Sequence, residues 1–245
     1  MQKKTFVIGD IHGCYHTLMA LIAKLPKDAR LIFVGDLCDR GNYSKEVIEF
    51  ISSNNYECVL GNHDYYMLRY IYDTLDGKRN MWNSYENMGH DTTLSSYAND
   101  RESLDKHILW ISTLPQYIQI DEYFITHAFA LPYYQRRDNH KFKEALMINR
   151  LNAPLRWKAN WEKDWKQYPI INIFGHDDAD EVQIGDNYYG IDTACVYGGK
   201  LTAIELGTMK LYQQKLLKRD INKSSNSFIK RFLSLSFPTT ITKSF

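Results

Sequence analysis

The sequence of 245 residues has few cysteines and no long apolar run, and each absence excludes a class of protein. The four cysteines, Cys14, Cys38, Cys58 and Cys195, form no CxxC pair, which argues against a thiolate zinc site or a disulfide framework. We therefore expect free thiols and a cytoplasmic location. The apolar run after Lys4 is too short for a signal peptide, and no later segment has the length and apolarity of a membrane span.

The sequence also lacks a strong charge of either sign. Its 30 Lys and Arg residues nearly balance 29 Asp and Glu residues, giving a net charge of +1, so we expect no nucleic-acid partner. A GxGxxG dinucleotide fingerprint is missing from the first glycine-containing segment, which reads GDIHG. A chain of this length can bury the core of one sizeable domain.

Short apolar runs alternate with helical patterns in the first 60 residues. Strands separated by single helices are typical of βαβ units, which build a parallel sheet in an α/β fold. Helices are expected over residues 17–25 and 44–51. The expected strands cover residues 5–8, 30–34, 56–60, 117–120, 123–126, 170–174, 188–191 and 201–206.

We expect a single domain over residues 1–213, with a helical insertion at about 64–114. Residues 214–245 form a basic, serine-rich tail. Its segment 227–237 has apolar residues at helical spacing beside Lys and Arg. Contact with a partner or a membrane surface is one interpretation of this pattern, and docking on the tail's own domain or disorder is the other.

Possible metal ligands follow several of the expected strands. Four apolar runs end in glycine and then such a residue, namely FVIGD at Asp10, IFVGD at Asp36, CVLGN at Asn62 and NIFGH at His176. A fifth run, YFITH, ends at His127, and His12 follows Asp10 by two positions. Because the carboxyl ends of parallel strands open on one edge of a sheet, these side chains should surround one point. Glycine before a ligand lets the backbone approach closely.

Helix capping is the competing interpretation for each Asp or Asn between a strand and a helix, and Asn62 is a good example. Capping does not explain why two histidines occupy the same structural position as the acids. We therefore predict a metal site. Oxygen and imidazole ligands without thiolate suit manganese first, with iron or zinc as alternatives.

The number of ligands predicts two divalent ions, because six exceed what a single four-coordinate ion needs. A shared carboxylate would then bridge the two ions. Two metals about 3.5–4 Å apart are the usual apparatus for in-line displacement at phosphorus. The pattern therefore indicates phosphoester hydrolysis.

Two further motifs fit this chemistry. GDLCDRG supplies Asp39 and Arg40, and GNHD supplies His63 beside Asn62. An arginine fork binds phosphate oxygens with two hydrogen bonds, and an imidazole held by a carboxylate can protonate an alkoxide leaving group. The alternative for Asp39 and Arg40 is a surface ion pair around a turn closed by Gly41.

In this order, the motifs GDIHG, GDLCDRG, GNHD, THA and GH resemble the phosphoprotein-phosphatase branch of the calcineurin-like metallophosphoesterases. The bacterial and phage serine/threonine phosphatases are the most similar members. The resemblance covers roughly residues 4–207 and includes IDTACVYGGKLTAIEL at 191–206 and NMGHDTTLSSY at 87–97. It implies a metallophosphoesterase fold, with a two-sheet β-sandwich core, flanking helices and a metal-activated hydroxide that attacks phosphorus in line.

The resemblance also implies a role for each residue. The first metal would be bound by Asp10, His12 and the bridging Asp36, and the second would be completed by Asn62, His127 and His176. His63 would be the general acid, oriented by Asp39.

Phosphate would be bound by Arg40 and Asn62, together with a second arginine. LMINR nominates Arg150, and Arg156 in LRWK is the alternative. The chain departs from the family pattern after His176, where two acids, Asp177 and Asp178, stand in place of a threonine and its neighbour. Their negative charge should weaken phosphate binding, unless they point outward, recruit a cation or favour a positively charged substrate region.

Three functions are consistent with these residues. The first is a metal-dependent phosphomonoesterase acting on serine/threonine phosphoproteins, with phosphotyrosine or small phosphoesters as further substrates. The second is a diadenosine polyphosphate hydrolase, although relatives with that activity tend to depart from the GDxHG and DRG forms. The third is a relative that binds phosphate without turnover.

Overall fold

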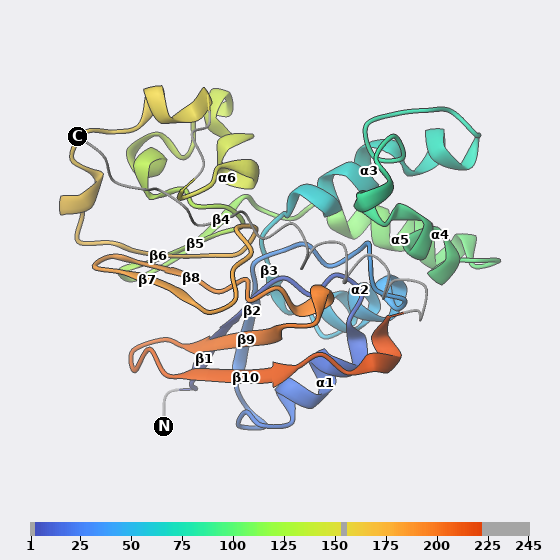
Figure 1. Ribbon diagram of the computed structural model, residues 1–245, viewed down its shortest axis with the longest axis horizontal. Coiled ribbons are helices and arrows are strands. Elements are labelled where there is room, and N and C mark those ends of the chain that lie inside the picture. The colour runs from blue at the N-terminus through green and yellow to red at the C-terminus, as the bar shows by residue number, and fades with distance from the viewer. Residues whose placement is uncertain (1–2, 153–155, 222–245) are drawn as a thin grey trace, which may run out of the picture.

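Two sheets, each of five strands, form the centre of the computed structural model, which describes residues 3–152 and 156–221 (Figure 1). The first sheet has the order β10-β9-β1-β2-β3, with bounds β1 Thr5–Ile8, β2 Arg30–Phe33, β3 Glu57–Cys58, β9 Lys200–Glu205 and β10 Leu211–Lys215. The second has the order β4-β5-β6-β8-β7, with bounds β4 Tyr117–Ile120, β5 Tyr123–Thr126, β6 Ile171–Phe174, β7 Gln183–Gly185 and β8 Tyr188–Gly190.

Both sheets contain three neighbouring parallel strands, at one side of the first sheet and in the middle of the second. β1, β2 and β3 are parallel and are joined by α1 (Tyr15–Ile22) and α2 (Ser44–Ser53), which confirms the βαβ units. β5, β6 and β8 are parallel in the second sheet, with β4 and β7 antiparallel at its edges. The parallel strands of each sheet therefore bring their carboxyl ends to one edge.

The core explains why these strands are apolar on both faces. Val7 and Ile32 of the first sheet pack with Ile125 and Ile173 of the second, so the two sheets form a sandwich. Neighbouring residues such as Phe6 point to the opposite face, where they pack with residues of α1 and α2. Burial on both faces requires a nearly continuous apolar run instead of alternation.

The insertion is helical and begins slightly earlier than expected. Its main helices are α3 (Asn62–Leu75), α4 (His90–Ser96) and α5 (Arg101–Ile111). Of these, α4 and α5 lie beside α2, and α3 packs against α5. Figure 1 shows them at the opposite side of the molecule from α6 (Ala145–Ile148). The short 3-10 helices are η1 Glu86–Met88, η2 Leu131–Arg136, η3 His140–Phe142, η4 Arg156–Asn160, η5 Trp165–Gln167, η6 Cys195–Tyr197 and η7 Lys218–Asp220.

The strand expected over residues 56–60 is shortened to Glu57–Cys58. Leu60 has left the sheet, since its N–H donates to the carbonyl of Pro115 at 2.8 Å. Two strands, β7 and β10, were not expected from the sequence. β7 spans three residues, too few to show a clear period, and β10 carries polar residues that are half-buried.

The C-terminal boundary expected after residue 213 falls inside β10, which pairs with β9 as far as Lys215. Beyond it, the buried carboxylate of Asp220 accepts hydrogen bonds from the N–H groups of His16 and Thr17, at 3.0 and 2.8 Å. Asp220 thus caps the N-terminus of α1, because the N-cap residue Cys14 makes no side-chain hydrogen bond there. Residues 222–245, including the expected amphipathic segment, lie outside the described residues. Within the described part, no helix is long and apolar enough to cross a membrane.

Candidate active site

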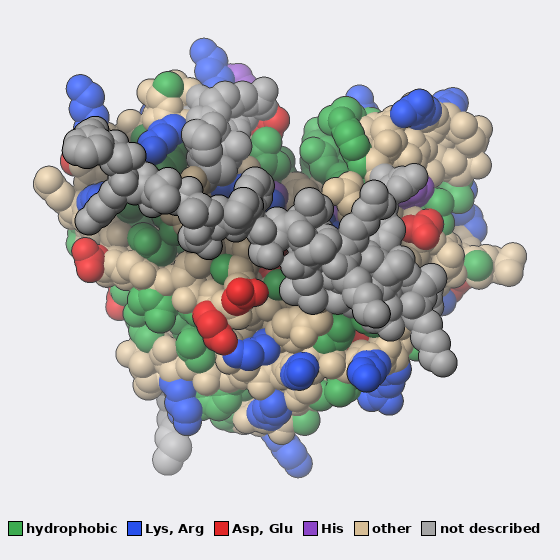
Figure 2. All heavy atoms as spheres, in the orientation of Figure 1, with side chains coloured by type: hydrophobic (Ala, Val, Ile, Leu, Met, Phe, Trp, Pro, Cys, Tyr) green, Lys and Arg blue, Asp and Glu red, His purple; other side chains and the backbone are tan. Residues whose placement is uncertain are grey.

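A cavity of about 310 Å³ lies where the strand ends of both sheets meet the insertion. The space-filling view shows a notch between the lobes that carry α3 and α6 (Figure 2). Of the residues predicted from the sequence, the cavity is lined by Asp10, His12, Asp36, Arg40, Asn62, His63, Arg150 and His176. Asp39 and His127 are fully buried behind this surface.

Several of the predicted site residues have a strained backbone conformation. Five of them have positive φ without being glycine, namely His12 (47°), Asp36 (50°), Asp39 (71°), Arg40 (71°) and His176 (63°). Such residues cost about 1–3 kcal/mol each and persist only where the surrounding structure fixes them. The N–H of His12, for example, donates to the carbonyl of Asp36 at 2.8 Å, which ties the first two strand ends together.

Glycine before a ligand is required by close packing at two positions. A Cβ on Gly61 would lie 2.3 Å from the backbone nitrogen of Asp36, and a Cβ on Gly175 would lie 1.9 Å from Oδ1 of Asp10. Both distances are shorter than any real contact. The close approach expected from the sequence is therefore present.

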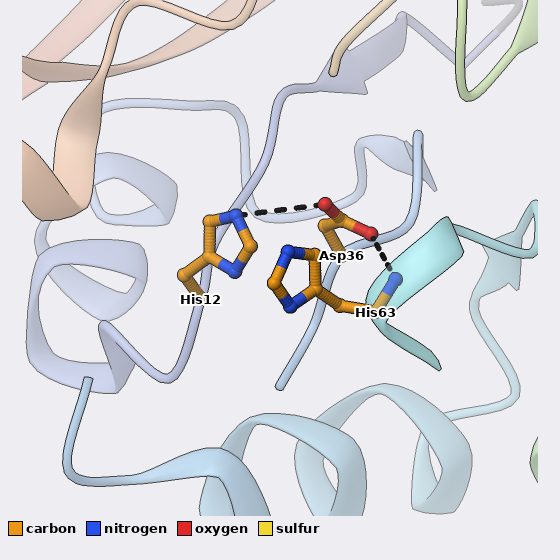
Figure 3. Close-up of side chains that lie close together, drawn as sticks. All are labelled: His12, Asp36 and His63. Carbon is orange, nitrogen blue, oxygen red and sulfur yellow. Dashed lines mark hydrogen bonds and ion pairs between the residues drawn. The ribbon is translucent and has the colours of Figure 1, made fainter. Parts of the chain in front are cut away.

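Asp36 lies at the centre of the site. Its Oδ2 is 3.5 Å from Nε2 of His12, and its Oδ1 is 3.3 Å from Nε2 of His127. Figure 3 shows the carboxylate between the His12 ring and the backbone N–H of His63, which donates to Oδ1 at 3.0 Å. Asp36 also belongs to both groups of convergent ligand atoms, one with His12 and His63 and one with His127 and His176. A carboxylate shared in this way has the arrangement of a bridging ligand.

Backbone carbonyls orient the imidazoles. Nδ1 of His12 donates to the carbonyl of Cys38 at 2.8 Å, and Nδ1 of His127 donates to the carbonyl of Val34 at 2.7 Å. A carbonyl on Nδ1 leaves Nε2 as the free ligand atom, as in many metal sites. Nε2 of His127 faces two oxygens, Oδ1 of Asn62 at 2.9 Å and Oδ1 of Asp36, and so needs a proton or a cation on that side.

The charge states follow from burial and from neighbouring groups. Burial, with Arg40 nearby, lowers the pKa of His12 well below its usual value, and burial with His127 does the same for the pKa of His176. Both rings are therefore neutral, as ligands must be. Burial alone would raise the pKa of Asp36, but the imidazoles of His127 and His63 hold it well below its usual value.

Asp10 lines the same cavity as His12 and Asp36, its expected partners, but it belongs to neither of the two close groups of ligand atoms. Its Oδ2 accepts the backbone N–H of His176 at 3.0 Å, which draws the carboxylate toward the second sheet. Its Oδ1 is buried without a hydrogen-bond partner in the described part of the chain. Burial and then Asp192 raise the pKa of Asp10 well above its usual value. A buried oxygen of this kind is stabilised by a proton or a cation, so the residue fits a metal site.

His63 and Asp39 form a buried hydrogen-bonded pair. Nδ1 of His63 donates to Oδ2 of Asp39 at 2.6 Å, and Nε2 lies 3.0 Å from Nη2 of Arg40. The other terminal nitrogen of Arg40 contacts Nε2 of His12, and its guanidinium lies 5.2 Å from the centre of the Tyr197 ring. The alternative of a surface ion pair between Asp39 and Arg40 is wrong, because Asp39 is fully buried and binds His63.

Arg150 lines the cavity and is paired with the unusual acids. Its Nη1 is 3.0 Å from Oδ1 of Asp177 and 3.6 Å from Oδ1 of Asp178. Asp177 also accepts the N–H of Leu151 at 2.9 Å, so it holds the loop that carries the arginine. The side chain of the alternative, Arg156, is not among those described.

Sequence reasoning missed three residues that contact this machinery. Asp192 lines the cavity, and burial with Asp178 nearby raises its pKa to about 6. Trp82 and Thr93 donate to the carboxylate of Asp39. Asp192 and Thr93 lie in stretches that stood out by family resemblance, whereas nothing in the local sequence distinguishes Trp82.

Comparison with known proteins identifies the family. Residues 3–136 match the family model described as calcineurin-like phosphoesterase. The chain belongs to this family, whose members are phosphoester hydrolases, as the sequence motifs predict.

Curated relatives carry a more specific name. The chain is 30% identical to the asymmetrical bis(5'-nucleosyl)-tetraphosphatase PrpE of Anoxybacillus flavithermus, over 83% of this chain and 91% of the relative. It is 27% identical to the symmetrical bis(5'-nucleosyl)-tetraphosphatase of Methylobacillus flagellatus, over 85% of this chain and 94% of the relative.

Solved structures share the fold at lower identity. A protein provisionally described as a diadenosine tetraphosphatase superposes with a TM-score of 0.62 at 22% identity, covering 88% of this chain and 95% of that one. A protein-tyrosine phosphatase of Shewanella gives 0.57 at 16% identity, covering 89% and 81%. The metallophosphoesterase family and fold are thus confirmed, while its protein-phosphatase branch is not. The identity of the metal and the cytoplasmic location stay predictions.

Proposed function

We propose that this protein is a metal-dependent hydrolase of dinucleoside polyphosphates that cleaves a phosphoanhydride bond. The observation that carries the proposal is the recurrence of the bis(5'-nucleosyl)-tetraphosphatase name among relatives that match 81–85% of the chain at 26–30% identity. Two arginines, Arg40 and Arg150, in one cavity also suit a substrate with several phosphates. This reverses the ranking that the GDIHG and GDLCDRG motifs favoured.

We propose two divalent ions that share Asp36 as a ligand. The neutral imidazoles of His12 and His176, the low pKa of Asp36 and the unpaired oxygen of Asp10 support their fit. One ion would be held by Asp10, His12 and Asp36, and the other by Asp36, Asn62, His127 and His176. When bound, such ions supply hydroxide near neutral pH and neutralise charge on phosphoryl oxygens.

The remaining residues would bind and orient the substrate. Arg40 presents a planar fork of donors to a phosphate, next to the ring nitrogens of His12 and His63. Arg150 would bind a further phosphate from the side of α6, after exchanging Asp177 for the substrate. His63, held by Asp39, would donate a proton or a hydrogen bond to the leaving oxygen.

The His63–Asp39 pair favours a second candidate, hydrolysis of phosphoserine or phosphothreonine in proteins. An alkoxide leaving group is far more basic than a nucleotide phosphate, and so it has the greater need of a general acid. The 2.6 Å hydrogen bond from His63 to Asp39 orients the imidazole for that role.

A substrate panel tests the proposal. We would strip the protein of metal, restore manganese and compare diadenosine tetraphosphate with phosphoserine, phosphothreonine and phosphotyrosine peptides and with p-nitrophenyl phosphate. We expect the dinucleotide to have the highest kcat/KM and to lose most of its turnover in Asp36→Asn and His63→Asn. The products separate the two kinds of cleavage, since asymmetrical cleavage gives ATP and AMP and symmetrical cleavage gives two ADP.

Two outcomes would overturn it. A kcat/KM at least tenfold higher for a phosphopeptide would support the second candidate. No turnover with manganese, iron or zinc, despite binding of the metal, would support a phosphate-binding relative without activity.

A further inference from the structure

The insertion contacts the carboxylate on which His63 depends. Oδ2 of Asp39 accepts Nδ1 of His63 at 2.6 Å and also Nε1 of Trp82 at 2.8 Å. Oδ1 accepts the hydroxyl of Thr93 at 2.7 Å, and the N–H of Asp39 donates back to that hydroxyl at 2.8 Å. Asp39, Trp82 and Thr93 are all fully buried. Both carboxylate oxygens of Asp39 are thus held by residues of the insertion.

The directions of these hydrogen bonds are unambiguous. An indole nitrogen can only donate, so Trp82 requires an acceptor and Asp39 provides it. The Thr93 hydroxyl donates its single proton to Oδ1 of Asp39 and accepts the backbone N–H of Asp39, and the Ser44 hydroxyl lies 3.1 Å from the same oxygen, at its second lone pair. Without Trp82 and Thr93, the carboxylate would be held by His63 alone and could rotate.

A turn stabilised by the side chain of Asn80 positions Trp82. Oδ1 of Asn80 accepts the N–H of Trp82 at 3.0 Å, and Nδ2 of Asn80 donates to Oγ1 of Thr74 at 2.9 Å, near the end of α3. α3 therefore carries His63 in its first turn, and the chain after its last turn returns Trp82 to the same carboxylate. The two ends of one helix are joined through Asp39.

The insertion also contacts the strained backbone at Asp39 and Arg40. Asp39 and Arg40 both have φ of 71°, and the N–H of Arg40 donates to the carbonyl of Gly89 at 3.1 Å. A Cβ on Gly89 would lie 2.5 Å from that nitrogen, so the two segments are in direct contact. Two consecutive strained residues need such support.

We propose that Trp82 and Thr93 are positioning residues that hold Asp39 so that Nε2 of His63 faces the leaving oxygen. The inference rests on the proposed phosphoanhydride hydrolysis, and it would apply equally to the phosphomonoesters of the second candidate function. It extends the proposal by giving residues of the insertion a role in orienting the general acid. Water supplies the attacking oxygen, and the bond from phosphorus to the leaving oxygen breaks. That oxygen takes the proton from Nε2 of His63, while the Nδ1 proton stays hydrogen-bonded to Asp39. The attacking water releases one proton to solvent as its oxygen bonds to phosphorus, and Nε2 of His63 regains a proton from solvent.

Aryl phosphates with different leaving groups test this role. Phenol is about as basic as a tyrosine side chain, with a pKa of about 10, and p-nitrophenol is more acidic. A misaligned acid should therefore slow phenyl phosphate more than p-nitrophenyl phosphate. In Thr93→Val and Trp82→Phe we expect kcat to fall about tenfold or more for phenyl phosphate and less than about threefold for p-nitrophenyl phosphate, with unchanged KM. Thr93→Ser keeps the hydroxyl and should retain nearly full kcat.

A double variant adds an independent check. Because Thr93 acts through His63, His63→Asn combined with Thr93→Val should lose no more activity than His63→Asn alone. Additive losses, equal losses on both aryl phosphates, or a loss confined to KM would each overturn the proposal. If Trp82→Phe fails to fold, the Thr93→Val and Thr93→Ser pair decides.

A proton NMR signal separates this inference from the proposed function. The Nδ1 proton of His63, in its short hydrogen bond to Asp39, should give a low-field resonance that His63→Asn removes. We expect Thr93→Val to shift this resonance upfield and Thr93→Ser to restore it. Wild-type protein inactive on every substrate would contradict the proposed function, and an unshifted resonance in Thr93→Val would contradict the positioning role.

Discussion

At the scale of single residues, the clearest departure from the family motif is Asp177, the acid that directly follows His176. The sequence predicts that an acid after His176 weakens phosphate binding, and the structure supplies a reason, because this acid is paired with Arg150 at 3.0 Å. Phosphate has to compete with a carboxylate for the same guanidinium. The Asp177 side chain is largely buried, with 13% of it exposed, so the alternative that it points outward is wrong.

Replacing Asp177 with Asn should strengthen inhibition by inorganic phosphate. Asn keeps an oxygen for the N–H of Leu151 but removes the charge that neutralises Arg150. The ion pair is partly exposed, so its loss is worth about 0.2–1 kcal/mol, or up to about a fivefold decrease in the inhibition constant. Asp186→Asn, at an exposed position between β7 and β8, is the matched control. An unchanged inhibition constant and KM in Asp177→Asn would show that the pair does not limit phosphate binding.

At the scale of elements, local patterns predict the strands and the residues at their ends. A short apolar run followed by glycine identifies Asp10, Asp36, Asn62 and His176. Such a pattern can be read from the sequence because strand geometry and close packing are encoded within a few residues. The contacts of Trp82 and Asp220 could not be predicted in this way. Each side chain meets a partner far away in the sequence, and such pairing depends on tertiary packing. The same limit explains why β10 is not predicted and why its last two residues fall in the expected tail.

Asp220 should stabilise α1 from the far end of the chain. It accepts three hydrogen bonds from the first turn, two from N–H groups and one from the hydroxyl of Thr17 at 2.6 Å. Because loss of a cap costs about 0.5–2 kcal/mol, Asp220→Ala should lower the free energy of unfolding by about 2 kcal/mol, measured by urea denaturation. Asp28→Ala, at an exposed position after α1, should change it little. Equal stability of both variants would mean that the hydrogen bonds of Asp220 do not stabilise α1.

At the scale of the whole molecule, the candidate ligands come from both sheets. Asp10, His12 and Asp36 follow strands of the first sheet, whereas His127 and His176 follow strands of the second. Bound ions would therefore cross-link the sandwich at one edge. The family and its phosphoester chemistry could be predicted from the ordered motifs, but the substrate could not, because metal ligands are common to enzymes with different substrates.

Metal binding should raise the thermal stability of the entire domain. A ligand at 100 times its Kd adds about 2.7 kcal/mol to the free energy of unfolding. For a domain of this size, that corresponds to an increase in Tm of about 5–10 °C. Calorimetry of stripped protein with and without manganese measures the shift, and His176→Asn should reduce it. A single Tm under both conditions, despite saturating manganese, would argue against ions that link the two sheets.

The contact between Thr17 and Asp220 also has a consequence for biosynthesis. These residues are 203 positions apart, so the first helix has no partner for its N-terminus until nearly the whole described chain has been made. At about 5–20 residues per second, that delay lasts roughly 10–40 seconds. His12 lies three residues before this helix and would share the delay, so a nascent chain would gain its active site only after Asp220 has been made.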